Sequence, residues 1–175
     1  QDAGVLVDEI VDNHADIVAA DLDERAQARA ADGIGALLDE LAGAGLAWVD
    51  IAALAGVSVP AVRKWRQGGA ASGTNLLEVA RAVVLLEWLG NEKLISDVAT
   101  WLEVPLDPAA PVARIDLLKA GRRDLVIRSL VADEGRPTDL LDEFDPDWRT
   151  RYASDFEVFT AEDGQRSIRS KGSHD

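Results

Sequence analysis

The feature that most constrains the fold is the segment Leu54–Gly69, LAGVSVPAVRKWRQGG, with the short stretch LAWVDIAA that leads into it. The small side chain of Ala52 lets two helices cross at close range, and Gly56 supplies the positive φ that a tight turn between them requires. One face of each helix must be buried, and the apolar residues available for this are Ile51, Leu54, Val57, Val62 and Trp65. This spacing predicts a helix-turn-helix motif, with Ser58 capping the second helix and Pro60 in its first turn.

The second helix of this motif carries cations and a few apolar residues on the face that it leaves exposed. The candidate DNA contacts on it are Ser58, Val59, Pro60, Arg63, Lys64 and Arg66. When such a helix lies in the major groove, an arginine donates two hydrogen bonds to a guanine, and a serine hydroxyl binds a phosphate. Three cations on a helix surface also fit simple solvation. One such module binds DNA weakly, so we expect a homodimer or a hetero-oligomer on operator DNA.

The chain as a whole is acidic, with 32 Asp and Glu against 18 Lys and Arg and a net charge of −14. Such a charge argues against indiscriminate nucleic-acid binding, which depends on many phosphate-neutralising cations. It suits a basic protein partner, and it equally suits simple solubility. The cations around Arg63 are therefore a local exception in this chain.

Residues suited to catalysis or metal binding are scarce. The chain has no cysteine, and its two histidines, His14 and His174, lie far apart in the sequence. Nothing in the sequence positions an acidic pair such as Asp142 and Glu143 as a general acid and base. We therefore expect no enzyme activity, no cofactor and no metal. The most apolar stretch, LLEVARAVVLLEWLG, is interrupted by three charges, so no membrane span is expected and a cytoplasmic protein fits.

Apolar periodicity predicts a mainly α fold in four parts. These are an N-terminal helical arm (1–31), a helix-turn-helix domain (32–92), a helical partner-binding domain (93–135) and an acidic, aromatic extension (136–175). Asp32 is expected to cap the first helix of the second part, and the proline-rich stretch 105–111 is expected to be a connector. Near the C-terminus, alternating apolar residues around Asp163-Gly164 predict a small β-hairpin.

The order of features along 34–135 resembles the Xre/MbcA/ParS antitoxin family, which joins an Xre-type helix-turn-helix to a toxin-binding domain. The shared features are a tryptophan on a short helix, a proline soon after it, a short helix that ends at glycine, and an apolar helix. They fall on Trp101, Pro105, Leu117, Leu118, Gly121, Val126 and Leu130. The sequence departs from the family pattern in that Pro111 is displaced and Arg114 stands near the expected proline.

The resemblance implies an antitoxin that neutralises a RES-domain toxin, an NAD-depleting enzyme, by covering the entrance to its NAD site. It also implies that the complex of the two proteins represses its own operon. The partner contacts that it implies are Trp101, Pro105, Leu117, Leu118 and Gly121. The extension adds Trp148, Tyr152 and Phe156 as candidate contacts, because aromatic residues dominate many interfaces. These aromatics equally suit an extension that packs back on the core.

Two other functions remain open at this point. One is a free-standing, dimeric helix-turn-helix transcriptional regulator, phage- or defence-related, whose C-terminal region dimerises or senses a signal. The other is an adaptor whose helix-turn-helix binds a protein instead of DNA.

Overall fold

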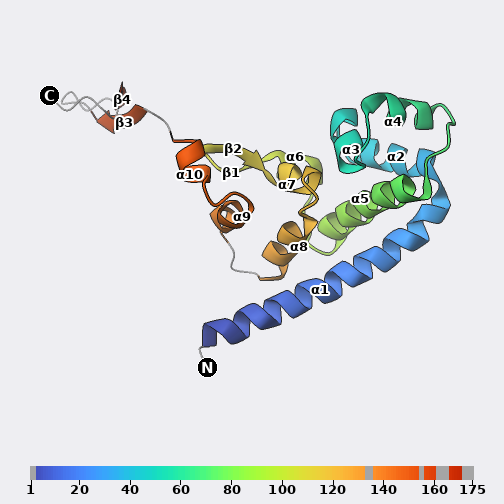
Figure 1. Cartoon of the computed structure of the whole chain (residues 1–175), viewed down its shortest axis with the longest axis horizontal. Helices are drawn as coiled ribbons and strands as arrows, with labels where there is room; N and C mark the ends of the chain where they lie inside the picture. The colour runs from blue at the N-terminus through green and yellow to red at the C-terminus, as the bar shows by residue number, and fades with distance from the viewer. Residues whose placement is uncertain (1–2, 133–135, 154–155, 161–165, 171–175) are drawn as a thin grey trace.

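The computed structural model describes residues 3–132, 136–153, 156–160 and 166–170, and it is mainly helical, as the sequence predicts (Figure 1). The first half consists of α1 (Ala3–Arg29), a 3₁₀ turn (Ala30–Asp32), α2 (Ile34–Gly43), α3 (Trp48–Leu54), α4 (Val59–Arg66) and α5 (Gly73–Asn91). The second half consists of α6 (Val98–Glu103), β1 (Pro105–Asp107), β2 (Ala110–Ala113), α7 (Arg114–Lys119), α8 (Arg123–Val131), α9 (Pro137–Phe144) and α10 (Trp148–Arg151). The last described elements are β3 (Phe156–Thr160) and β4 (Arg166–Ser170).

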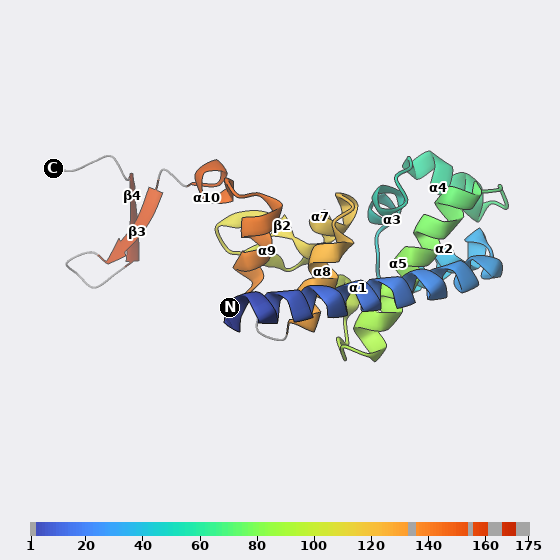
Figure 2. The ribbon, with the colours of Figure 1, turned by 60° about the horizontal axis from the view of Figure 1, so that its bottom comes forward.

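The longest helix, α1, lies along both halves of the chain and packs against α5 and α8 (Figures 1 and 2). Its buried stripe is formed by Ala15, Leu22 and Ala26, and the two small alanines let neighbouring helices approach closely. The opposite face carries Ile10 and Ile17, which are 68% and 61% exposed. The helical segment predicted as an N-terminal arm therefore ties the two halves together.

Helix α5 is the centre of the core, in contact with α1, α2 and α3. Its buried residues are Val79, Ala80, Val83, Val84, Leu85, Leu86, Trp88 and Leu89. A helix that is apolar on most of its circumference is stable only when other elements cover it on several sides. One hydrophobic cluster runs from α1 to α10, so helices of all four predicted parts share a core.

The stretch 105–111 is not the expected connector, because it forms most of an antiparallel hairpin of β1 and β2. Pro105 lies opposite Ala113, at the start of a strand, where the missing N–H is tolerated. Leu106 and Val112 are buried while Pro111 is exposed. Prolines thus occupy positions that point to solvent, and the aliphatic residues between them face the core.

Two local predictions about helix and hairpin ends have opposite outcomes. Asp32 does not cap α2, because Gly33 occupies the N-cap position with φ +87°, and Asp32 pairs with Arg29 at 2.5 Å. The C-terminal hairpin is confirmed, since β3 and β4 pair antiparallel with Phe156 opposite Ser170. The Asp163-Gly164 turn of this hairpin lies outside the described residues.

Residues 136–153 of the C-terminal extension pack back on the body. Helix α9 contacts β1 and α8, and its Leu140 and Leu141 are buried. Trp148 is only 5% exposed, and its indole Nε1 donates a hydrogen bond of 2.8 Å to Asp142. The sequence left open whether this segment contacts a partner or packs back on the core. Residues 136–153 pack on the core.

An ionic contact joins α1 to both halves of the chain. One carboxylate oxygen of Asp23 accepts hydrogen bonds from Arg81 of α5 at 3.1 Å and from Arg123 of α8 at 2.6 Å. Burial acts to raise the pKa of Asp23, but the hydrogen bonds and charges of the two arginines outweigh it, so this pKa lies below its ordinary value. The ionised carboxylate is therefore the form that the fold favours.

The lowered pKa predicts how the Asp23 contact depends on pH. A group whose pKa is depressed by folding stabilises the fold above its unfolded pKa, and this contribution is lost as the pH falls through the folded pKa. We expect Asp23→Asn to lower the urea midpoint of unfolding at pH 7, and the gap to the parent chain to close below about pH 4. Asp21→Asn is the control, because among the described residues Asp21 pairs only with Arg25, on its own exposed helix surface. A gap that stays constant down to acid pH would contradict this account.

Candidate nucleic-acid interface and partner surface

Helices α3 and α4 form the predicted helix-turn-helix. Gly56, in the turn between them, has φ +66°, in the left-handed region that glycine adopts at least cost. Ser58 is the N-cap of α4, and its Oγ accepts a hydrogen bond of 3.4 Å from the backbone N–H of Ala61. Pro60 lies in the first turn of α4, where a backbone N–H has no partner within the helix.

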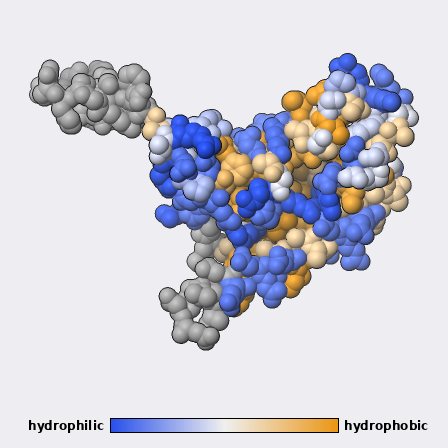
Figure 3. Space-filling view, in the orientation of Figure 1, coloured by the Kyte–Doolittle hydropathy of each residue, from blue (hydrophilic) through white to orange (hydrophobic). Residues whose placement is uncertain are grey.

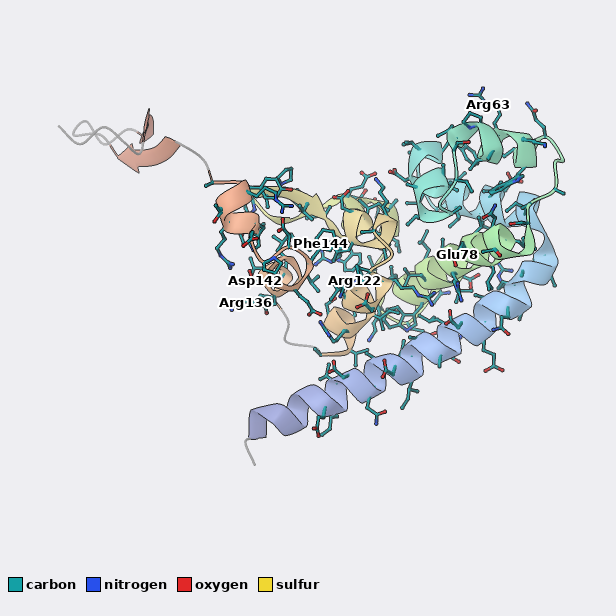
Figure 4. All side chains as sticks on the ribbon, viewed as in Figure 1. Arg63, Glu78, Arg122, Arg136, Asp142 and Phe144 are labelled. Carbon is teal, nitrogen blue, oxygen red and sulfur yellow. The ribbon has the colours of Figure 1, made fainter. Side chains whose placement is uncertain are left out.

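Burial divides α4 into two faces. Val62 and Trp65 are 1% and 5% exposed and pack with the buried Ala52 of α3 and the rest of the core. The predicted contacts Ser58, Pro60, Arg63, Lys64 and Arg66 are exposed, and Val59 is partly buried against the core. Arg63 points away from the body of the molecule, at the end farthest from α9 (Figure 4). The cationic face of α4 is therefore open to a ligand the size of DNA.

Most cations of the chain are already neutralised by its carboxylates. Ion pairs involve Arg25, Arg29, Arg81, Lys119, Arg122, Arg123, Arg128, Arg136, Arg149 and Arg151. Among the side chains that the structure describes, Arg63 and Lys64 have neither an ion pair nor a hydrogen bond nor an aromatic ring beneath them. Arg63 and Lys64 thus have no internal partner among the described residues, although the chain as a whole is strongly acidic.

Arg66 is oriented differently from the other two cations of α4. Its guanidinium carbon lies 3.9 Å from the centre of the Trp48 ring, at the start of α3. A cation stacked on an indole is attracted by the ring and loses rotational freedom. Arg66 therefore sits at the edge of the α4 face, held against α3, while Arg63 and Lys64 occupy its open part.

The predicted partner contacts divide into core residues and surface residues. Leu117, Leu118 and Trp148 are 0%, 8% and 5% exposed. They belong to the core of this chain, so the expectation that they touch a partner is corrected; of the three, Leu118 reaches the surface, where it lines a hollow. The apolar pair Leu117-Leu118 anchors α7 on the core, which the sequence pattern alone did not distinguish from a contact.

The remaining partner candidates lie nearer the surface. Trp101 and Tyr152 are partly buried against the core, while Pro105 and Gly121 are exposed. Gly121 ends the turn after α7 with φ +77°. The side chain of Phe156 lies outside the described residues.

A hollow of about 430 Å³ lies between the helix-turn-helix and the second half of the chain. Apolar surface gathers between α3 and α5 at this place in Figure 3. The hollow is lined by the turn of the helix-turn-helix (53–56), by Leu85 and Leu86 of α5, and by Leu118. Charged residues at its edge include Arg81 and Arg123, both of which also bind Asp23. The turn of the helix-turn-helix thus forms part of the wall of this hollow.

Sequence reasoning did not identify Trp48 as a support for Arg66, or Arg114 as a partner of Trp101. The guanidinium carbon of Arg114 lies 4.2 Å from the centre of the Trp101 ring. A tryptophan at the start of the first motif helix was a usable signal for Trp48, because α3 and α4 must cross near their ends. Arg114 had no such signal, since the β1–β2 hairpin that brings it to Trp101 was not predicted.

Comparisons with protein-family models, with curated protein sequences and with solved structures find no match for this chain. The antitoxin resemblance therefore rests on the order of its sequence features alone. No helix in the described part of the chain is long and apolar enough to cross a membrane. Within the same residues, no three His, Asp or Glu side chains gather in a way that could hold a metal ion.

The turn of the motif can be tested through its glycine. A Cβ at Gly56 would meet no atom within 4 Å, so the cost of Gly56→Ala comes from its positive φ alone. We expect a loss of about 1–2 kcal/mol in the free energy of unfolding, measured by urea denaturation. Gly35→Ala within α2 is the matched control, because it also meets no atom within 4 Å and has helical φ, so it should be neutral or stabilising. Equal effects of the two substitutions would contradict the role of the turn.

Proposed function

We propose that this protein is an antitoxin-type repressor that binds operator DNA through α4 and holds a RES-type toxin inactive through its second half. The observation that carries the DNA-binding part is the unpaired charge of Arg63 and Lys64 on the exposed face of α4. The carboxylates of the chain neutralise most other cations, but this charge has no partner within the part of the chain that the structure describes. Phosphates and guanine edges are the groups that such a face of a helix-turn-helix would bind.

The toxin-binding part of the proposal has narrower support. It draws on the resemblance along 34–135 and on the partly exposed Trp101 and exposed Pro105. The net charge of −14 favours a basic partner over a second copy of the chain as the ligand of the acidic surface. Both proposed activities belong to the cytoplasm, where the operon and the toxin would be found together.

One observation favours a second candidate function, a free-standing transcriptional regulator that senses a signal. The apolar hollow beside residues 53–56 touches the turn of the helix-turn-helix. A small molecule bound there would press on the element that sets the angle between α3 and α4. On this alternative, operator binding would respond to a ligand and would need no protein partner.

Removing the unpaired cations of α4 tests the DNA-binding proposal. We expect Arg63→Ala/Lys64→Ala to weaken binding to the DNA upstream of the gene at least about tenfold, because two charge-assisted contacts are lost. The slope of log K against log salt concentration should fall by roughly 2, since two fewer counterions are displaced. Mobility shifts at several salt concentrations measure both quantities.

Arg149→Ala/Arg151→Ala is the matched control for this experiment. It removes the same charge from a surface where both arginines are ion-paired, with Asp142 and Asp145. The control should leave affinity and salt slope nearly unchanged. If the α4 variant behaves like this control, α4 does not contact DNA, and a protein-binding adaptor becomes the better description.

Co-expression with the neighbouring gene tests the toxin-binding proposal. We expect the two products to purify as one complex, and the growth arrest and NAD loss caused by the neighbour alone to be relieved. Operator binding without any complex would instead support the free-standing regulator.

A further inference from the structure

Arg114 is an exception in the charge pattern of the second half. It is partly buried, and its Nε is fully shielded from solvent and makes no hydrogen bond with the described residues. No carboxylate lies within ion-pair distance of it in the part of the chain that the structure describes. The neighbouring Asp116 is engaged elsewhere, since its carboxylate accepts a hydrogen bond of 2.9 Å from the backbone N–H of Ala113.

This arrangement leaves a partly desolvated positive charge without a carboxylate partner among the described residues. Burial lowers the pKa of the Arg114 guanidinium, and no nearby carboxylate offsets that effect. The Trp101 ring, 4.2 Å away, supplies a partial counterweight through its electron-rich face. The two terminal nitrogens of Arg114 also make no hydrogen bond with the described residues, and they are not shielded as Nε is, so a carboxylate from outside can bond to them.

Two exposed apolar residues adjoin Arg114 and Trp101 across the hairpin and along the chain. Pro105 is paired with Ala113, the residue before Arg114, and is exposed. Val104, next to it, is 48% exposed, which is unusual for a valine beside the core. We call these four residues, Trp101, Val104, Pro105 and Arg114, which adjoin along the chain, across the β1–β2 hairpin or through the cation–ring contact, the Trp101–Arg114 patch. A central aromatic and arginine with apolar neighbours is the composition typical of binding hot spots.

We propose that the Trp101–Arg114 patch receives an acidic side chain of the protein partner, whose carboxylate bonds to the Arg114 guanidinium while its apolar neighbours cover Trp101 and Val104. The proposal rests on the proposed function only in requiring that the chain has a protein partner. The positive charge of Arg114 favours a carboxylate as the ligand. The apolar residues Trp101, Val104 and Pro105 favour a carboxylate that belongs to a peptide with apolar neighbours, because a small hydrophilic anion would leave them uncovered.

A peptide titration tests the patch without the partner. The full chain, labelled with ¹⁵N, is titrated with acetyl-Leu-Glu-Leu-amide, and the Arg114 Nε–H and Trp101 indole signals are followed, each assigned by substitution. We expect both signals to shift and saturate with a dissociation constant of about 1 mM or weaker. Acetyl-Leu-Gln-Leu-amide should leave them in place, and sodium acetate should shift them less than the acidic peptide.

Arg136 is the internal control in this titration, because its side chain is 82% exposed and pairs with Asp139. Equal shifts at Arg136 and Arg114, equal shifts with the Gln peptide, or no shift at all would overturn the proposal. A response to acetate as large as that to the peptide would also overturn it, since it would indicate a site for small anions.

The isosteric substitution Arg114→Met separates a binding role from a structural one. Because it removes an uncompensated buried charge, we expect the melting temperature to stay equal or rise, while affinity for the co-expressed neighbour falls at least about tenfold. Arg136→Met should change neither quantity. Undiminished partner affinity with Arg114→Met would overturn the proposal and leave the antitoxin function standing. If the neighbour does not bind the parent chain at all, the antitoxin function fails, and the peptide titration still decides the patch.

Discussion

The packing of α1 across α5 and α8 is the contact on which the rest of the arrangement depends. Its stripe of Ala15, Leu22 and Ala26 is buried, and Asp23 beside that stripe joins an arginine from each half of the chain. Without α1, the two halves would meet mainly through the contacts of α7 with α3 and of α6 with α5. The helix therefore fixes the relation between the first half, which carries α4, and the second half, which carries Trp101 in α6.

Ion pairing within the chain explains how a strongly acidic protein can still present a few free positive charges. An excess of carboxylates makes the protein acidic, and these carboxylates also form ion pairs with most of the cations in the described part of the chain. The cations without an ion pair are informative, because a charge without an internal partner has to be solvated or bound by a ligand. Arg63 and Lys64 are solvated and open, which suits DNA. Arg114 is partly buried and stacked on Trp101, which suits a single carboxylate.

Local patterns in the sequence predicted the helix-turn-helix in detail, but they did not predict the hairpin and the packing contacts in the second half of the chain. Gly56, Ser58 and Trp65 were assigned correctly, because turn, cap and buried-face chemistry depend on residues a few positions apart. The β1–β2 hairpin was missed because its prolines resemble those of a connector. Whether Leu117 and Trp148 face a partner or the core depends on α8, α9 and β1 folding over them, and such contacts between distant segments leave no local signal.

The central claim is that one chain binds DNA and a protein partner through two separate surfaces. The most direct measurement places a photo-crosslinking amino acid at position 64 or at position 101 and irradiates the full chain with operator DNA and the co-expressed neighbour present together. We expect position 64 to capture DNA only and position 101 to capture the protein only. Capture of the neighbour at position 64, or of DNA at position 101, would contradict the account.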